Sequence, residues 1–256
     1  MTLLHVEQLT HYFGGLRAVQ AFNLELQPGE LVAIIGPNGA GKTTVFNLIT
    51  GVYRPTEGII VFQGQNLVGQ PTHKIISRGV ARTFQNVRLF KELSVLDNVR
   101  IAHYTRAGYS PLEALLRRPR FREQERRVRQ ETLDLLNIFG LDTLAESTAK
   151  NLPYGQQRRL EIARALATRP SLLLLDEPAA GMNPAEVEQL METILWIRRE
   201  FQLTILLIEH QMRIVMGIAE RIKVLDFGET IAEGTPQEIQ NNPQVIEAYL
   251  GEDVAA

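Results

Sequence analysis

The sequence contains no cysteine, so neither a disulfide framework nor a metal site built on thiolates is possible. A long hydrophobic run is also missing, because the purest apolar stretch, residues 172–175, has only the length of a strand. The first residues do not combine a basic start with a long apolar core, as a signal peptide would. We therefore expect a cytosolic protein, unless a partner holds it at a surface.

Neither charge sign dominates the sequence. The formal net charge is −2 over 256 residues, of which 22% are charged. General nucleic-acid binders are usually basic, so we expect no nucleic-acid partner. Hydrophobic residues make up 45%, which is ordinary for a globular protein. The length suits one large α/β domain, or a domain with a subdomain.

The chain is organised around a glycine-rich segment at residues 36–44, Gly-Pro-Asn-Gly-Ala-Gly-Lys-Thr-Thr, which fits the phosphate-binding loop pattern at every specified position. A strand-sized apolar run precedes it, and a helical pattern follows and ends at Gly51. In this arrangement, backbone N–H groups and a helix N-terminus surround a phosphate. The segment predicts a nucleoside triphosphate site in which Lys42 reaches the β- and γ-phosphates and the Thr43 hydroxyl binds magnesium. The predicted nucleotide-binding residues are Gly36, Asn38, Gly39, Gly41, Lys42, Thr43 and Thr44.

Strand and helix patterns alternate along much of the chain. Residues 3–35 have mainly strand patterns, a short helix begins near Thr72, and the texture is helical from about residue 84 to 167. A final helix begins after Gly234, with capping residues at its start. Such alternation predicts parallel βαβ units around a buried sheet, and hence an α/β fold. Further strands are predicted at residues 59–62, 172–175, 204–208, 222–225 and 230–232, and further helices at about 185–200 and 212–219.

Arginines are dense in the helical region. A basic patch for anionic lipid or a partner is one interpretation. Acidic residues interleave, such as Glu123 four residues before Arg127, and this favours an ordinary solvated helix face. The arginines are Arg117, Arg118, Arg120, Arg122, Arg126, Arg127 and Arg129.

Two acidic residues, Asp176 and Glu177, directly follow the apolar run at 172–175. The end of a buried parallel strand lies at the sheet edge where α/β folds bind ligands. Asp176 suits magnesium, and Glu177 suits a general base that polarises the attacking water. In-line phosphoryl transfer needs that water oriented while the cation and Lys42 absorb developing charge.

With these motifs the chain resembles, over its full length, the ATP-binding subunit of ABC transporters. The resemblance implies a P-loop NTPase (RecA-like) fold, with a parallel-sheet core, an N-terminal antiparallel β subdomain and a helical subdomain. It implies one domain over residues 1–256, with the core at 1–84 and 168–256 and the helical signature subdomain at 85–167. ATP and Mg²⁺ are the implied cofactors.

The resemblance also assigns single residues. Phe13, with neighbouring Tyr12 as the alternative, matches the aromatic residue that stacks on adenine. Gln85 matches the glutamine that ligates magnesium and senses the transmembrane partner. His210 matches the switch histidine that contacts the γ-phosphate and positions water. Asn183 replaces the usual aspartate of the D-loop.

The signature segment departs from the family pattern. Where Leu-Ser-Gly-Gly-Gln is usual, this chain has Leu-Pro-Tyr-Gly-Gln at residues 152–156. Pro153 has neither hydroxyl nor N–H and cannot make the bond that serine would give to a γ-phosphate of the opposite subunit. Gly155 and Gln156 are retained, and the Gly155 N–H and the helix dipole can still bind an anion. The change is compatible with slower hydrolysis or with a subfamily variant.

Four stretches make the resemblance closest to ATP-binding subunits that import branched-chain or other hydrophobic and neutral amino acids. They lie at residues 82–90, 157–164, 176–184 and 242–251. This implies transmembrane permease subunits, a second ATP-binding subunit and a substrate-binding protein as partners, and a peripheral place on the cytoplasmic face of the membrane. ABC transporters of urea, amides or lipids, or a soluble cassette ATPase, are the alternatives.

In such a complex two subunits sandwich two ATP molecules. Each site combines residues of one subunit with Gly155 and Gln156 of the other, and the residues of the first subunit are Lys42, Asp176, Glu177 and His210. The resemblance implies that a helical segment at about residues 86–103 docks on the membrane subunits, and its apolar residues in a polar context support this expectation. These residues are Leu89, Phe90, Leu93 and Val95.

Other nucleotide-binding classes fit less well. Translation factors carry two cassettes, and repair ATPases insert a long coiled coil. The sequence has neither, and it has no Asn-Lys-x-Asp guanine motif of a GTPase. A nucleotide kinase would not need the Gly155-Gln156 and His210 positions. The triplet Asp226-Phe227-Gly228 resembles a kinase motif, but no His-Arg-Asp loop precedes it, and we interpret it as a hairpin turn.

Overall fold

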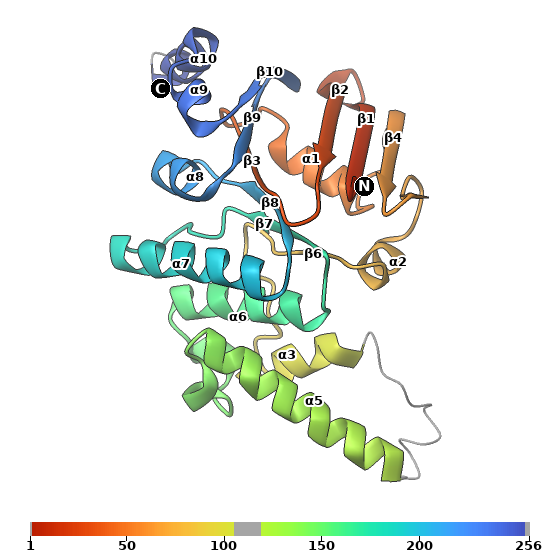
Figure 1. Cartoon of the computed structure of the whole chain (residues 1–256), viewed down its shortest axis with the longest axis vertical. Helices are drawn as coiled ribbons and strands as arrows, with labels where there is room; N and C mark the ends of the chain where they lie inside the picture. The colour runs from red at the N-terminus through yellow and green to blue at the C-terminus, as the bar shows by residue number, and fades with distance from the viewer. Residues whose placement is uncertain (1, 105–118, 254–256) are drawn as a thin grey trace.

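Two β-sheets form the frame of the chain (Figure 1). The computed structural model describes residues 2–104 and 119–253. A four-stranded antiparallel sheet, in the order β2-β1-β4-β5, forms the N-terminal part. Its strands are β1 (Leu4–Phe13), β2 (Leu16–Leu26), β4 (Glu57–Phe62) and β5 (Gln65–Asn66).

A six-stranded sheet, in the order β10-β9-β3-β8-β7-β6, forms the centre. All its pairs are parallel except the terminal β9–β10 hairpin. Every residue of β3, β7 and β8 is buried, as expected for parallel strands covered on both faces. The strands are β3 (Leu31–Ile35), β6 (Val80–Arg82), β7 (Leu172–Asp176), β8 (Thr204–Ile208), β9 (Arg221–Asp226) and β10 (Glu229–Gly234).

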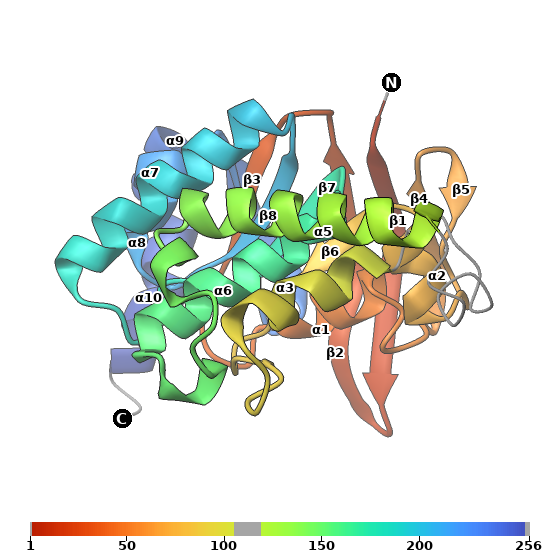
Figure 2. The same ribbon diagram turned by 90° about the horizontal axis from the view of Figure 1, so that it is seen from below.

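The six-stranded sheet lies between two hydrophobic cores because its side chains alternate. Val32 and Ile34 of β3 pack with the four-stranded sheet and α1. Leu31, Ala33 and Ile35 pack instead with the helices of the other face. On that face α3 and α5 lie outermost and α6 lies between them and the sheet (Figure 2). The predicted α/β class, with its parallel core, antiparallel β part and helical part, is confirmed.

The helices match most of the predicted ones. They are α1 (Lys42–Ile49), α2 (Thr72–Ser77), α3 (Val95–His103), α5 (Pro119–Ile138), α6 (Tyr154–Ala167), α7 (Pro184–Glu200), α8 (Met212–Ile218), α9 (Pro236–Gln240) and α10 (Pro243–Asp253). Capping boxes begin two of them, Asn183 with Glu186 at α7 and Thr235 with Glu238 at α9. Within the described ranges, no helix is long and apolar enough to cross a membrane.

The predicted helical start near residue 84 is wrong. Residues 83–94 contain no helix, and α3 begins only at Val95. The fully buried Asn98 side chain donates to Phe90 O and Ser94 O and accepts from Phe90 N. The side chain of Asn98 thus takes the place of helical hydrogen bonds for these backbone groups of the loop.

The structure differs from the sequence prediction in two further places near this loop. The short strand β6 was not predicted, since three residues are too few for a pattern. Val95, expected on the docking surface, is completely buried in the core and cannot contribute there. Phe90 is exposed, Leu93 lies at the boundary of exposure and Leu89 packs partly against the core.

The arginine-rich helix α5 carries mixed charge in its described part. Arg127 pairs with Glu131 at 2.8 Å and Arg129 with Glu146 at 3.1 Å. These pairs fit a solvated helix face. Arg117 and Arg118 lie outside the described residues.

Candidate functional site

The predicted reactive residues follow four strands of the central sheet. The phosphate loop follows β3, Gln85 follows β6, Glu177 follows β7 and His210 follows β8. These strands are parallel neighbours, so their carboxyl ends meet at one edge. A pocket of about 620 Å³ lies there. Its walls are Leu16, Arg17, Ala18, Asn38, Gly39, Ala40, Gly41, Lys42, Thr43, Thr44, Gln85, Glu177 and Phe227.

The phosphate loop has the backbone shape that the sequence predicts. Gly36 and Gly41 have φ of 145° and 96°, which side chains rarely tolerate. A Cβ on Gly41 would lie 2.4 Å from Ala18 O, so the close approach of β2 also requires glycine. Lys42 Nζ donates to Gly36 O at 2.6 Å and Pro37 O at 2.7 Å. The ammonium is therefore held over the loop, where a phosphate would take over its bonds.

Glu177 contacts two of the other predicted catalytic residues, Gln85 and His210. Gln85 Nε2 donates to Glu177 Oε2 at 2.9 Å, and His210 Nδ1 lies 3.8 Å from the same oxygen. Glu177 also has φ of 47°, an uncommon conformation that costs about 1 kcal/mol or more and occurs often at active sites. The structure thus brings Gln85, Glu177 and His210 together, and of these three Gln85 and Glu177 line the pocket.

Asp176 is buried beside an arginine that the sequence analysis did not single out. Its Oδ2 accepts from Arg82 Nη2 at 2.7 Å, and both side chains are 5% exposed or less. Burial raises the pKa of Asp176, while Arg82 opposes this effect. Asp176 Oδ1 is buried with no hydrogen-bond partner. An unpaired, buried carboxylate oxygen is a ligand of the kind that a magnesium ion prefers, so Asp176 fits the predicted cation.

Some predicted residues lie outside this pocket. Phe13 and Tyr12 do not line it, and Phe13 packs edge-on against Tyr53 with ring centres 5.2 Å apart. Gly155 and Gln156 lie at the start of α6 and do not line it either.

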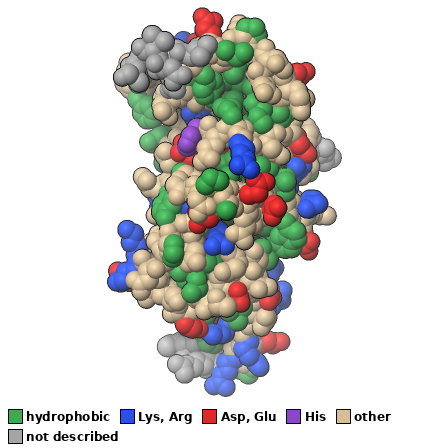
Figure 3. Space-filling model, turned by 90° about the vertical axis from the view of Figure 1, so that its left-hand side faces the viewer, with side chains coloured by type: hydrophobic (Ala, Val, Ile, Leu, Met, Phe, Trp, Pro, Cys, Tyr) green, Lys and Arg blue, Asp and Glu red, His purple; other side chains and the backbone are tan. Residues whose placement is uncertain are grey.

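Figure 3 shows the face on which the N-terminal ends of α6 and α7 lie. On this face hydrophobic side chains are interspersed with charged ones, and Lys and Arg side chains gather at its lower end.

Sequence reasoning missed several residues that hold the site. Glu209 is fully buried and accepts from Ala179 N, His210 N and Gln211 N at 3.0–3.2 Å. Arg158 is fully buried and contacts the Gln85 backbone. For Glu209 the available signal was an acid directly after an apolar run, whereas Arg158 stands among polar residues and its partners are more than 70 positions away in sequence.

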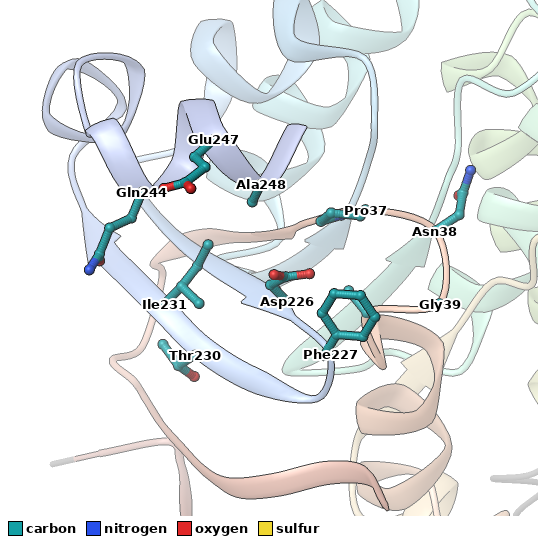
Figure 4. Close-up of a pocket in the computed structure, with 11 residues that line it drawn as sticks. Pro37, Asn38, Gly39, Asp226, Phe227, Thr230, Ile231, Gln244, Glu247 and Ala248 are labelled. Carbon is teal, nitrogen blue, oxygen red and sulfur yellow. The ribbon is translucent and has the colours of Figure 1, made fainter. Parts of the chain in front are cut away.

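A second pocket, of about 840 Å³, lies on the other side of the loop (Figure 4). It extends from Pro37 and Asn38 to Asp226 and Phe227 of the hairpin turn and to Glu247 of α10. Although it is larger, it lacks Lys42, Glu177 and Gln85. We therefore assign the phosphate chemistry to the smaller pocket.

The hairpin turn at the end of β9 braces the phosphate loop. Gly228 N donates to Ala40 O at 3.1 Å, and Gly228 O accepts from Gln20 N at 2.8 Å. The interpretation of Asp226-Phe227-Gly228 as a turn is confirmed.

The comparisons with known proteins agree with this geometry. The ABC transporter family matches residues 19–180, and a family described as branched-chain amino acid ATP-binding cassette transporter matches residues 229–255. The chain is 50% identical to the high-affinity branched-chain amino acid transport ATP-binding protein LivG of Escherichia coli, over 98% of each chain.

Two solved structures share the fold. MJ1267, an ATP-binding cassette of an ABC transporter in its ADP conformation, has 32% identity, a TM-score of 0.84 and covers 98% of this chain and 99% of its own. The ATP-binding cassette MJ0796, a dimer bound to ADP and phosphate, has 26% identity, a TM-score of 0.76 and covers 91% and 98%. The predicted P-loop NTPase fold is confirmed, and the chain belongs to the ABC transporter family as an ATP-binding cassette.

Proposed function

We propose that this chain hydrolyses ATP to power the import of branched-chain amino acids, as a peripheral subunit on the cytoplasmic face of the membrane. The observation that carries the hydrolysis is the Glu177 carboxylate, which lines the phosphate pocket, is held by Gln85 and lies near His210. The amino-acid class is supported by the match at residues 229–255 and by LivG.

Binding begins at the phosphate loop. Backbone N–H groups of the loop and the N-terminus of α1 face the phosphates, and Lys42 exchanges its bonds to Gly36 O and Pro37 O for phosphate oxygens. Thr43, Gln85 and Asp176 would hold Mg²⁺, which supplies neutralisation of the charge on the phosphate oxygens. Phe13 is our proposed adenine contact, with Tyr12 as the alternative.

Hydrolysis needs a base and an oriented water. Glu177 accepts a proton from the water while the oxygen of the water forms a bond to the γ-phosphorus. At the same time the bond between the γ-phosphorus and the leaving oxygen of ADP breaks. Gln85 fixes the carboxylate through its amide, and His210 is near enough to orient the water or the γ-phosphate. The products are ADP and phosphate.

A second cassette would complete each site. We assign Gly155 and Gln156, at the N-terminal end of α6, to the γ-phosphate bound by the opposite subunit. Permease subunits and a substrate-binding protein are the other proposed partners. The loop at residues 86–94, with the half-exposed Phe90, is the proposed docking surface, and residues 85–167 form the proposed helical signature subdomain between two parts of the core.

The test uses the chain assembled with its permease subunits in vesicles. Glu177→Gln should lower ATP hydrolysis by about 100-fold or more, since general bases contribute at least that much, while ATP still binds. Glu188→Gln is the matched control, because Glu188 pairs with Arg213 on the surface. The rate of ATP hydrolysis and the uptake of leucine into the vesicles are measured in the presence of leucine and a leucine-binding protein.

Three outcomes separate the alternatives. Leucine stimulation that disappears in Glu177→Gln supports the proposal. Stimulation by urea, an amide or a lipid instead would overturn the amino-acid class while keeping the transport ATPase. If the rate of ATP hydrolysis were the same with and without the membrane subunits, the transport function would be overturned and a soluble cassette ATPase would be favoured.

A further inference from the structure

Buried charged side chains of α6 hold the loop that carries Gln85. Arg158 is 1% exposed, and its guanidinium donates to two consecutive backbone carbonyls, Phe84 O and Gln85 O. Residues 83–94 have no helical bonds of their own. The fork of the guanidinium therefore fixes the backbone of Gln85 directly.

Glu161, one turn further along α6, completes this clamp. It is also 1% exposed, and Glu161 Oε1 accepts from Arg88 N at 3.1 Å while Oε2 lies 3.4 Å from Arg158 Nη1. The two buried side chains thus bond three backbone groups of the loop, on both sides of the Gln85 side chain. Arg164 lies nearby, with Nη2 at 3.9 Å from Glu161 Oε1.

Two contacts connect this clamp to the chemistry and to the signature segment. Gln85 Nε2 donates to Glu177 Oε2 at 2.9 Å. At the other end, the Arg158 guanidinium lies 5.4 Å from the centre of the Tyr154 ring. That ring packs on Gly181, two residues before the D-loop position Asn183, because a Cβ on Gly181 would lie 3.0 Å from Tyr154 Cε1. A continuous path of contacts therefore runs from Gly181 through Tyr154 and Arg158 to Gln85 and Glu177.

We infer that Arg158 and Glu161 are positioning residues, which hold the Gln85 amide against Glu177 and couple its place to the N-terminal end of α6. The inference rests on the proposed function, since Glu177 must be the base for the position of Gln85 to matter. A purely structural role is a poor reason for two buried charges, because apolar residues of similar volume stabilise a core equally well or better. The bonds of this pair go to the loop at the site.

Arg158→Lys is the direct test. Lysine keeps the charge, but its single ammonium group cannot replace the two guanidinium nitrogens that donate to Phe84 O and Gln85 O. We expect the kcat for ATP to fall by about tenfold, as for a small misplacement of a catalytic group, with less than a twofold change in the dissociation constant for a fluorescent ATP analogue. Arg159→Lys is the matched control, because Arg159 Nη1 donates to Phe139 O at the end of α5 and makes no bond to the loop.

A double-mutant cycle identifies the route. If Arg158 acts through Gln85, then Arg158→Lys should lower kcat by less than about twofold in a Gln85→Ala background. Glu161→Gln provides a second variant that keeps the acceptor for Arg88 N and removes only the charge. It should lower kcat in the same direction, and the Gln85→Ala background should also abolish its effect.

The outcomes are distinguishable. The inference would be overturned if Arg158→Lys and Arg159→Lys lowered kcat equally, or if the loss in Arg158→Lys added fully to that in Gln85→Ala. It would also be overturned if kcat, the affinity for ATP and the melting temperature fell together. A purely structural role of Arg158 predicts each of these results. A wild-type chain that hydrolyses ATP and loses activity in Glu177→Gln keeps the proposed function even then. A wild-type chain without hydrolysis overturns both.

Discussion

At the scale of single residues, two adjacent carboxylates have different environments. Asp176 is 1% exposed and paired with Arg82, whereas the side chain of Glu177 is 16% exposed and contacts Gln85. The difference arises because Asp176 still belongs to β7, while Glu177 leaves the strand with φ of 47°. As a result, Asp176 stays buried beside Arg82, while Glu177 lines the phosphate pocket.

Glu209 illustrates how a buried residue supports the site. Its carboxylate accepts three backbone N–H bonds and so fixes the start of the segment that carries His210. In Glu209→Gln one oxygen becomes an NH₂ group that faces these donors. We expect the free energy of unfolding to fall by about 2 kcal/mol, and kcat by about tenfold, because charged hydrogen bonds of this kind are lost and His210 moves.

Urea denaturation and steady-state ATP hydrolysis measure both effects. Glu220→Gln is the control, since Glu220 accepts from Leu31 N but is half exposed. Equal effects of the two variants would contradict the role of Glu209.

At the scale of elements, the β9–β10 hairpin joins an ion-pair cluster to the phosphate loop. Glu233 of β10 lies opposite Lys223 of β9 and pairs with both Lys223 and Arg221. Lys223 is only 5% exposed, so its charge depends on Glu233 for compensation. The same hairpin bonds the phosphate loop through Gly228.

This cluster predicts a pH-dependent contribution to stability. Burial raises the pKa of Glu233, but the hydrogen bonds and charges of Lys223 and Arg221 outweigh it, and the pKa lies below its ordinary 4.5. The stabilisation is therefore complete above pH 4.5 and is lost as pH falls through the lower folded value. At pH 7, Glu233→Gln should cost about 2 kcal/mol, less than for a fully buried pair because a third of Glu233 stays exposed.

Urea denaturation between pH 7 and pH 3 checks this prediction. The difference between wild type and Glu233→Gln should be constant down to about pH 5 and shrink below it. Glu229→Gln on the same strand is the control, because the Arg17–Glu229 pair is exposed and should contribute less than about 1 kcal/mol. A difference that grows on acidification would refute the ion-pair explanation.

At the scale of the whole molecule, the residues that we propose for one nucleotide site lie in two places on the chain. The phosphate pocket lies at the carboxyl edge of the central sheet, while Gly155 and Gln156 do not line that pocket. Because Gly155 and Gln156 lie outside the pocket of their own chain, we propose that they act on a nucleotide bound by a second cassette.

This arrangement predicts dimerisation that depends on ATP. Glu177→Gln, which binds ATP without turning it over, should reach twice the monomer mass in sedimentation velocity with MgATP and remain a monomer with ADP. Lys42→Ala added to this variant should abolish the dimer, because the phosphates lose their cation. A Glu177→Gln chain that stays monomeric at saturating MgATP would rule out a homodimer and leave pairing with a different cassette.

Local features of this protein could be predicted from the sequence because neighbours along the chain determine them. The glycines of the phosphate loop, Asp176 and Glu177 at the end of β7, the turn at Phe227 and the cap at Thr235 all depend on residues within a few positions. Strand and glycine patterns locate such features without knowledge of the fold.

Only the tertiary structure decided which distant residues meet. Arg158 reaches carbonyls more than 70 positions away, Asp176 pairs with Arg82, and Val95 becomes part of the core. Nothing near Asn98 in sequence indicates that its amide would replace helical bonds in the loop before α3. Backbone groups without regular partners must be satisfied somewhere, and the packing of α6 against the central sheet determined which side chains do so.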